Sequence, residues 1–374
     1  MRMRKFFLFL TLLCAALVLV GCDNREKLYV LNWEEYINRD VVRRFEEEYN
    51  VKVVLDTATS NESMYNKIKN RAGKYDIVIP SDYMIERMYQ EGLLIKLDYS
   101  KIPNYDASMF DPHLQELRDN YFQGNEDYAV PYFWGSLGIM YNNKPGVKEG
   151  VKELVEKYEW RVFFEKDLLP ANVTVGMYDS SRDAVACALL YLATTRRDDD
   201  YSLNTTNPEH YNMVENLFKN VSYSQWGTDE LKMSVVSQNL DIALVYSGDF
   251  FDQYYFALET GADITFDMHM PTERNNIWFD AMVIPNTATK VDLAHAFINF
   301  FLDVDNAIEN TIHVGYCSGI TEVIAAVRED EEFAEIASHP AYYPGAVNGE
   351  IYRHLGQDIA LRMDEILTKA KIGR

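Results

Sequence analysis

Short apolar runs alternate with amphipathic stretches from residue 28 onward. Between the runs, apolar residues recur at helical spacing, as Val41, Phe45 and Tyr49 do, and Ser60 can cap the second of the predicted helices. The order strand, helix, strand, helix, strand predicts a parallel sheet joined by right-handed crossovers. The three predicted strands lie at residues 28–31, 51–55 and 76–80.

The middle of the chain repeats this pattern with different loops. A strand is predicted at residues 173–177, and the next helix carries Val185 and Leu189 on its buried face. A further strand at residues 241–246 runs into Ser-Gly-Asp and another helix. Two α/β units within 374 residues predict two domains, and no low-complexity linker separates them.

The first 21 residues have the pattern of a secretory signal peptide. Arg2, Arg4 and Lys5 precede an apolar run at residues 6–20, which is shorter than the roughly 20 residues of a membrane span. The ending Leu-Val-Gly-Cys resembles the bacterial lipoprotein box. We therefore expect cleavage before Cys22, acylation of its sulfur, a tether over residues 22–27, and a location on the periplasmic side of a bacterial membrane. The alternative is an ordinary signal peptide in which Cys22 is incidental.

Composition and charge narrow the classes of partner. The chain is 48% hydrophobic and 25% charged, as folded domains are. Its formal net charge of −22 opposes binding to nucleic acid and anionic lipid head groups, and it attracts small cations. Besides Cys22, the cysteines beyond the signal peptide are Cys187 and Cys317, for which we expect two buried free thiols rather than a disulfide.

Familiar catalytic and cofactor motifs are missing from the sequence. It contains no Gly-rich phosphate loop, no His-Glu-x-x-His, no Gly-x-Ser-x-Gly and no Cys-x-x-Cys. The seven histidines are scattered without the spacing of metal ligands. We therefore expect neither an enzyme nor a bound cofactor or metal.

Aromatic and acidic residues occur together where the predicted strands end, which is the edge at which parallel α/β sheets bind ligands. Taken singly, each segment is explained by core aromatics and helix N-caps. Together they predict an aromatic trough with acidic ends. Such a trough suits an organic diammonium, because carboxylates pair with its cations and ring faces attract them by about 0.5–2 kcal/mol each. The segments are Asn-Trp-Glu-Glu-Tyr at 32–36, Ser-Asp-Tyr at 81–83, Tyr-Ser-Gly-Asp at 246–249 and Ile-Trp-Phe-Asp at 277–280.

These segments and three others, taken together, resemble the spermidine/putrescine-binding proteins of bacterial polyamine ABC importers. The others are Asn-Glu-Ser-Met-Tyr at 61–65, Val-Pro-Tyr-Phe-Trp-Gly at 130–135 and Val-Gly-Tyr at 314–316. The resemblance implies an α/β fold of two lobes, each a mainly parallel sheet flanked by helices, that close on the ligand like a Venus flytrap. It implies an N-terminal lobe of residues 28–133 and 275–322 and a C-terminal lobe of residues 134–274 and 323–374.

The resemblance also implies an extracytoplasmic receptor, monomeric and not an enzyme, that delivers polyamines to the permease subunits of an ABC importer. Asp280 and Glu35 are the leading candidates for partners of the ligand ammonium groups. The pocket positions carried over from the family are Trp33, Glu35, Tyr36, Ser81, Tyr83, Asp183, Tyr246, Asp249, Trp278, Asp280 and Tyr316.

Three positions depart from the family. Tyr246 stands where the family has a tryptophan, Ser180 where spermidine receptors have an acid, and Tyr352 where those receptors have a glutamine. Asp249 matches an acid of the putrescine-selective members. Because Ser180 removes one possible ammonium partner, the resemblance favours putrescine over spermidine.

Three other interpretations stay open at this point. The adjacent tyrosines at 254–255 and 342–343 could offer phenolates to ferric iron in a receptor of the same architecture. A surface hydrolase could use two of the 58 acidic residues. A receptor-like sensor would signal instead of transporting its ligand.

Overall fold

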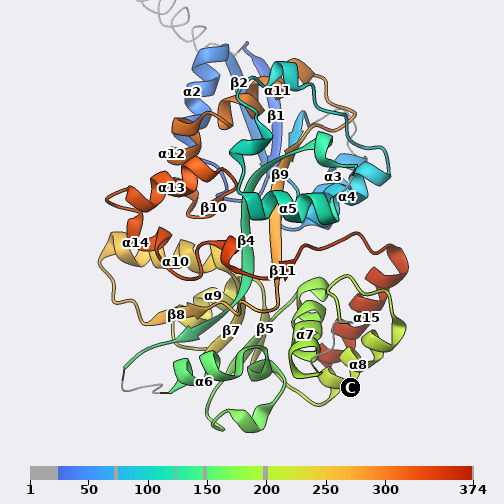
Figure 1. The fold of residues 1–374 in the computed structure, drawn as a ribbon, viewed down its shortest axis with the longest axis vertical. Helices are drawn as coiled ribbons and strands as arrows, with labels where there is room; N and C mark the ends of the chain where they lie inside the picture. Colours follow the sequence, from blue (N-terminus) through green and yellow to red (C-terminus); the bar gives the residue numbers. More distant parts are fainter. Residues whose placement is uncertain (1–23, 71–74, 123, 146–149, 197–200, 373–374) are drawn as a thin grey trace, which may run out of the picture.

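The computed structural model describes residues 24–70, 75–122, 124–145, 150–196 and 201–372. The elements form two groups stacked along the long axis of the molecule, and the long strands β4 (Ala129–Asn142) and β9 (Asn275–Val283) run between them (Figure 1). The predicted signal peptide and Cys22 lie outside the described residues. Within the described part, no helix has the length and apolar character needed to cross a membrane.

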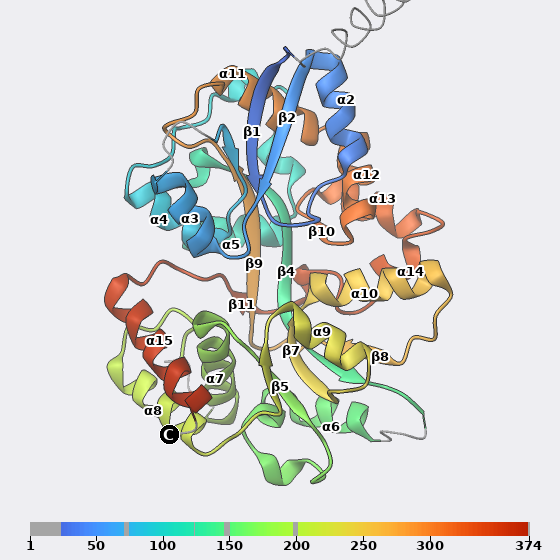
Figure 2. The same ribbon diagram turned by 180° about the vertical axis from the view of Figure 1, so that it is seen from behind.

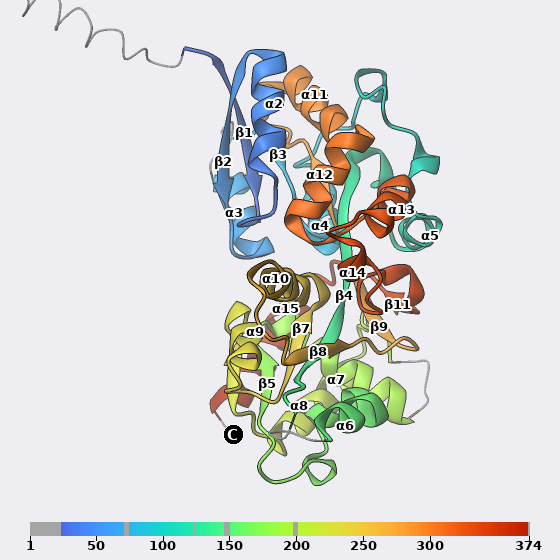
Figure 3. The same cartoon turned by 90° about the vertical axis from the view of Figure 1, so that its left-hand side faces the viewer.

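The upper group contains the first three predicted strands. In it, β1 (Glu26–Asn32) pairs in parallel with β2 (Val51–Thr57) and with β3 (Ile77–Val78), as predicted. Strand β3 is shorter than the predicted residues 76–80, although the N–H groups of Asp76 and Ile79 still donate to the carbonyls of Tyr29 and Leu31 in β1. Helices cover both sides of these strands (Figures 1 and 3): α2 (Arg39–Tyr49) and α12 (Val304–Val314) lie on one side, and α3 (Asn61–Asn70) and α4 (Asp82–Gln90) lie on the other.

The lower group is a second α/β unit, also as predicted. Strand β5 (Val175–Tyr178) pairs in parallel with β6 (Gln225–Gly227) and β7 (Ile242–Tyr246). Three helices pack against one another on one side, as Figure 2 shows, and two lie on the other side. The three are α7 (Ser181–Arg196), α8 (Pro208–Lys219) and α15 (Gln357–Ile372), and the two are α9 (Asp229–Val236) and α10 (Ser247–Thr260).

Strands β4 and β9 connect the two groups into one mixed sheet of order β2-β1-β3-β9-β4-β7-β5-β6. Strand β4 pairs antiparallel with β9 at residues 129–136 and then with β7 at residues 137–141, with a register shift between Pro131 and Trp134. Every residue of β4 and β9 is buried. The predicted lobe boundary at 133/134 lies inside β4, and the one at 322/323 lies inside α13 (Thr321–Glu329); the lobe limits stay a prediction.

Smaller elements complete the described chain. Cys187 and Cys317 are both buried and free, as expected. The remaining helices and strands are α5 (Pro112–Tyr121), α6 (Val151–Tyr158), α11 (Val291–Phe301), α14 (Ala334–Ala337), β8 (Phe266–His269), β10 (Cys317–Ser318) and β11 (Gly349–Glu350), with 3₁₀ turns at Tyr99–Lys101, Ala107–Met109, Glu126–Tyr128, Glu159–Phe163, Lys166–Leu168 and Pro344–Ala346.

Candidate ligand-binding site

The loop after β1 presents Trp33, Glu35 and Tyr36 at the end of the strand. The Tyr36 carbonyl accepts hydrogen bonds from Asn32 Nδ2 at 3.2 Å and from Tyr132 Oη at 3.0 Å. The Tyr36 ring is buried, whereas Glu35 is exposed and has a φ of 51°. These backbone contacts fix Tyr36 in the interior, whereas the Glu35 side chain is exposed.

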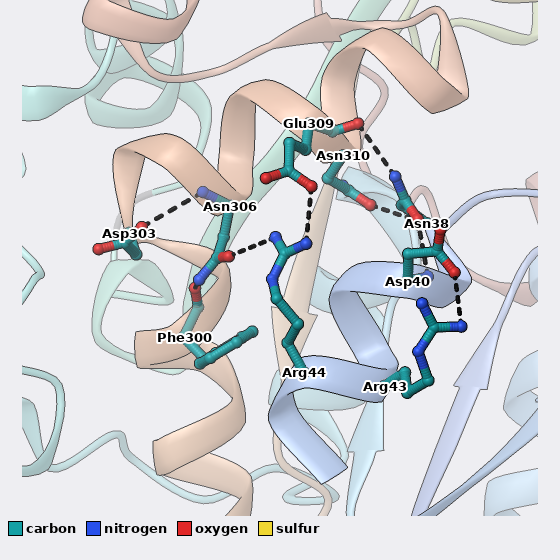
Figure 4. Close-up of polar contacts among 9 residues, drawn as sticks. All are labelled: Asn38, Asp40, Arg43, Arg44, Phe300, Asp303, Asn306, Glu309 and Asn310. Atoms are coloured by element: carbon teal, nitrogen blue, oxygen red, sulfur yellow. Dashed lines mark hydrogen bonds and ion pairs between the residues drawn. The ribbon is translucent and has the colours of Figure 1, made fainter. Parts of the chain in front are cut away.

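Helix α12 holds the far end of this loop. Asn310 Oδ1 accepts a hydrogen bond from the Asn38 N–H at 2.8 Å (Figure 4), and Asn310 Nδ2 donates to Tyr132 Oη at 2.8 Å. Arg44 of α2 adds two hydrogen bonds to α12 side chains, each of 2.8 Å. Because α12 ends one residue before Gly315, the same helix also sets the position of Tyr316.

The segment after β3 brings two carboxyl groups together. Ser81 forms a backbone bridge to Asp280 of β9, and Asn61 holds Ser81 through hydrogen bonds of 3.0 Å to its N–H and its Oγ. The next residue, Asp82, is buried and close enough to Asp280 for their charges to repel. Two acids, one at the start of α4 and one in β9, therefore share one buried region.

Both carboxyl groups are unfavourably placed for carrying a charge. Burial raises the pKa of Asp280 to about 7, although the hydroxyls of Ser81 and Tyr36 oppose the shift. Burial also raises the pKa of Asp82 well above its usual range; the Tyr83 N–H opposes this, and the Asp280 charge adds to it. Asp280 Oδ1 and Asp82 Oδ2 have no hydrogen-bond partner in the described chain. Such oxygens are suited to a cationic donor.

Four aromatic rings gather beside these acids, and we call them the aromatic cluster: Tyr36, Tyr246, Trp278 and Tyr316. The Tyr316 ring centroid lies 5.0 Å from that of Tyr36 and 5.7 Å from that of Trp278, and Trp278 lies 5.9 Å from Tyr246, all edge to face. A Cβ at Gly248 would lie 2.0 Å from the Tyr316 ring, so this packing requires glycine there. The Trp278 indole N–H is buried without a hydrogen-bond partner in the described chain.

Asp183, at the start of α7, already has protein partners. It accepts hydrogen bonds from Tyr246 Oη at 2.5 Å and from Tyr352 Oη at 3.0 Å. Burial raises its pKa, which these hydroxyls and that of Ser180 oppose. Ser180 Oγ accepts from the Asp183 N–H at 3.4 Å, as expected of a residue capping this helix. Tyr246 thus joins the acidic and aromatic groups through its hydroxyl.

Asp249, at the start of α10, is paired with a lysine. Lys232 Nζ lies 3.2 Å from Asp249 Oδ1, and the Tyr316 hydroxyl donates to the same oxygen at 3.4 Å. Burial raises the pKa of Asp249, while the charge of Lys232 opposes this effect. Unlike Asp280, Asp249 is a carboxylate whose charge the protein compensates.

The other predicted residues lie at the margin of this region. Trp33 is half-buried, and its indole N–H is buried without a partner in the described chain. Tyr83 donates to Glu62 at 3.0 Å, and its ring centroid lies 6.3 Å from that of Tyr352. The structure therefore brings Ser81 and Asp280 together with the aromatic cluster, whereas the Glu35 side chain is exposed.

Three charged residues near the site were not predicted from the sequence. Asp82 belongs to the Ser-Asp-Tyr segment at 81–83, but an acid at this position is equally typical of the first turn of a helix. The Arg182 guanidinium lies 4.4 Å from the Tyr352 ring centroid and 5.9 Å from that of Tyr83. Lys232 lies 17 positions before its partner Asp249, so only the tertiary fold reveals the pair.

The tyrosine pairs considered for iron do not converge. Tyr254 Oη donates to Glu335, Tyr342 Oη to the Tyr316 carbonyl, and Tyr343 Oη to Asp111. Among the residues that the structure describes, no group of three or more His, Cys, Asp or Glu side chains could hold a metal ion. The geometry does not favour the iron receptor.

Comparisons with known proteins agree with the resemblance seen in the sequence. Residues 40–341 match the model of a family described as bacterial extracellular solute-binding protein. The spermidine/putrescine-binding periplasmic protein of Escherichia coli strain K12 is 30% identical over 360 residues, covering 94% of this chain and 93% of the relative. The putrescine-binding periplasmic protein SpuD of Pseudomonas aeruginosa is 29% identical over 92% of this chain and 90% of its own.

Solved structures give the same result for the fold. The spermidine/putrescine ABC transporter substrate-binding protein PotD of Streptococcus pneumoniae superposes with a TM-score of 0.72 at 29% identity, covering 93% of this chain and 99% of that one. The TpPotD lipoprotein of Treponema pallidum superposes with a TM-score of 0.71 at 27% identity, covering 92% and 99%. The predicted two-lobed binding-protein fold and the predicted family resemblance are confirmed.

Proposed function

The chain belongs to the family of bacterial extracellular solute-binding proteins, and we propose that it is a polyamine receptor that delivers its ligand to an ABC importer. The family consists of solute-binding proteins and not of enzymes. The observation that carries the proposal is the pair of buried carboxyl groups, Asp82 and Asp280, each of which keeps one oxygen without a hydrogen-bond partner in the described chain, beside the aromatic cluster.

In the proposed binding mode, one ligand ammonium group binds at Asp280. It supplies hydrogen-bond donors to Asp280 Oδ1 and Asp82 Oδ2, which lack them, and its charge offsets the repulsion between the two carboxylates. The faces of Trp278 and Tyr36 attract the cation and cover the methylene groups that follow it. A neutral solute of the same size gains none of these charge terms.

We further propose that putrescine binds more tightly than spermidine. Ser180 caps α7 where spermidine receptors have an acid, and so it offers no charge to a third ammonium group. The Tyr352 hydroxyl is already engaged with Asp183. The part of the site around Asp183 therefore provides fewer hydrogen-bond and charge partners for the longer triamine.

Binding between two lobes is the second part of the proposal. We place the N-terminal lobe at residues 28–133 and 275–322 and the C-terminal lobe at residues 134–274 and 323–374. The proposed pocket takes Tyr36 and Ser81 from the first lobe and Tyr246 from the second. A ligand that touches both stabilises the closed state by its differential affinity for that state.

The N-terminus completes the proposal. We propose that residues 1–21 are removed and that the new N-terminal Cys22 carries lipid, so that a monomeric receptor is held on the periplasmic side of the membrane. Two or more acyl chains give stable anchoring, which a single chain does not. The similar Treponema pallidum protein is itself described as a lipoprotein.

A thermal unfolding panel tests this function. The purified protein is freed of co-purified ligand by unfolding and refolding, and its Tm is measured with putrescine, spermidine or ferric iron. Ligands that bind only the folded state raise the Tm in a concentration-dependent way. We expect both polyamines to raise it and iron to leave it unchanged. No shift with either polyamine would contradict the proposal.

A further inference from the structure

We infer that Lys232 is a tethered counter-cation that occupies the Asp249 end of the site and so weakens the binding of a second ligand ammonium group there. Lys232 Nζ lies 3.2 Å from Asp249 Oδ1 and 3.0 Å from Asp252 Oδ2. This inference deepens the proposed function and rests on it, because it assumes an organic ammonium ligand.

The lysine is held in place and charged. Its side chain is only 14% exposed, although it belongs to the short helix α9. Burial alone lowers its pKa, but Asp249 and Asp252 outweigh this effect, so the pKa of Lys232 lies above its usual value. The Lys232 ammonium group does not readily leave Asp249, since both of these largely buried charges would then lose their compensation, whereas Asp252 is exposed.

Asp249 connects this lysine to the aromatic cluster. The oxygen that faces Lys232 also accepts the Tyr316 hydroxyl at 3.4 Å, and the Tyr316 ring packs on Trp278 and Tyr36. Asp249 and Asp280 therefore both act on Tyr316 of the aromatic cluster, and we take Asp249 as the anion available to the second end of a diamine bound at Asp280. The protein already supplies a cation to that anion.

The two acidic ends are consequently not equivalent. Within the described chain, Asp82 and Asp280 take part in no ion pair, and each keeps one oxygen without a hydrogen-bond partner. At the other end of the site, Lys232 pairs with both Asp249 and Asp252 and so neutralises the charge of Asp249. A ligand's first ammonium group gains a full charge pair at Asp280, whereas its second must compete with Lys232 or remain near Asp183.

Calorimetric titration of the full-length mature protein with putrescine and with butylamine tests this inference. Lys232→Met keeps the length of the side chain and removes its charge. We expect this variant to bind putrescine about tenfold more tightly than the wild type, while butylamine, with one ammonium group, changes less than about twofold. The double variant Lys232→Met/Asp249→Asn should lose the gain.

Two controls keep the result interpretable. Lys219→Met removes the same charge from an exposed lysine of α8 that pairs with Glu215, and it should leave putrescine affinity unchanged. Lys232→Arg, which keeps the positive charge beside Asp249 and Asp252, should leave the putrescine affinity within about threefold of that of the wild type.

The opposite results overturn the inference. Putrescine affinity that is unchanged or lower in Lys232→Met, or equal gains for putrescine and butylamine, would show that Lys232 does not compete with the ligand. A gain in Lys232→Arg equal to that in Lys232→Met would show that the positive charge of Lys232 is not what weakens binding. If the wild type bound no polyamine, the proposed function itself would fail, which is a distinguishable outcome.

Discussion

Asp280 shows how ligand binding and stability oppose each other at a single residue. It is 4% exposed, one of its oxygens has no partner in the described chain, and its pKa lies near 7. The unfolded chain has a carboxyl pKa of about 3.9. Because the folded pKa is the higher one, the folded state binds more protons between these values, and Asp280 lowers stability progressively as pH rises from about 4 to 7.

Asp280→Asn should therefore separate the two properties. At pH 8 we expect the ligand-free variant to have a free energy of unfolding higher than that of the wild type by up to about 4 kcal/mol, because a buried charge is removed. Putrescine affinity should fall at least about 100-fold. Denaturant unfolding and calorimetry measure the two effects.

Asp76→Asn is the matched control for this variant. Asp76 is also a buried aspartate of the upper group, but it accepts hydrogen bonds from the N–H groups of Tyr29, Thr289 and Lys290. Its replacement should lower stability and leave putrescine affinity in place. A loss of affinity equal to that of Asp280→Asn would mean that Asp280 acts only through the fold.

The pH dependence of binding follows from the same carboxyl group. An ammonium ligand requires the ionised form of Asp280, so binding below pH 7 must displace a proton. We expect putrescine affinity to rise by up to about tenfold per pH unit as pH approaches 7 and to level off above it. In Asp280→Asn this rise should be smaller, because only Asp82, whose pKa burial also raises, remains to titrate in this region. A wild-type affinity that falls between pH 5 and 7 would contradict the assignment.

At the scale of elements, much of the site could be predicted from the sequence. The segments after the predicted strands at residues 28–31 and 241–246 were both expected to line the site, and Tyr36 and Tyr246 do join one aromatic cluster. Glu35 was expected there too. Its side chain is exposed, and its backbone has a φ of 51°, a turn conformation that strand periodicity cannot reveal.

Asn310 illustrates what a sequence pattern cannot show. It is a buried amide on α12 that joins the Asn38 N–H to the Tyr132 hydroxyl, and Tyr132 in turn holds the Tyr36 carbonyl. These partners lie 178 and 272 positions away from it in the sequence. No local signal distinguishes such a residue from an ordinary polar residue of a helix.

Asn310→Ala should lower putrescine affinity about tenfold, because the loop that carries Tyr36 loses its anchor. Asn306→Ala is the control: it removes a neighbouring contact between α12 and Arg44 of α2 without touching the loop. We expect calorimetry to give an affinity within about twofold of the wild type for Asn306→Ala. Equal losses in both variants would show that only the packing of α2 on α12 matters.

At the scale of the whole molecule, the site depends on segments that link the two groups of elements. Besides β4 and β9, the chain leading to α15 returns past the upper group, where Arg353 donates to Glu86 of α4 at 2.7 and 3.0 Å and the His354 N–H donates to Glu86 at 2.7 Å. The order of elements predicted two α/β units. It could not predict that β4 and β9 connect the two units, because these strands are buried throughout and show no alternation of apolar and polar residues.

Calorimetric titration of the ligand-stripped protein with putrescine and spermidine at pH 8 is the decisive test of polyamine binding. We expect saturable binding of one putrescine per chain and weaker binding of spermidine. Absence of binding heat with both polyamines, in protein whose refolding is confirmed by its thermal transition, would contradict this expectation and would reduce the aromatic and acidic segments to core and cap residues.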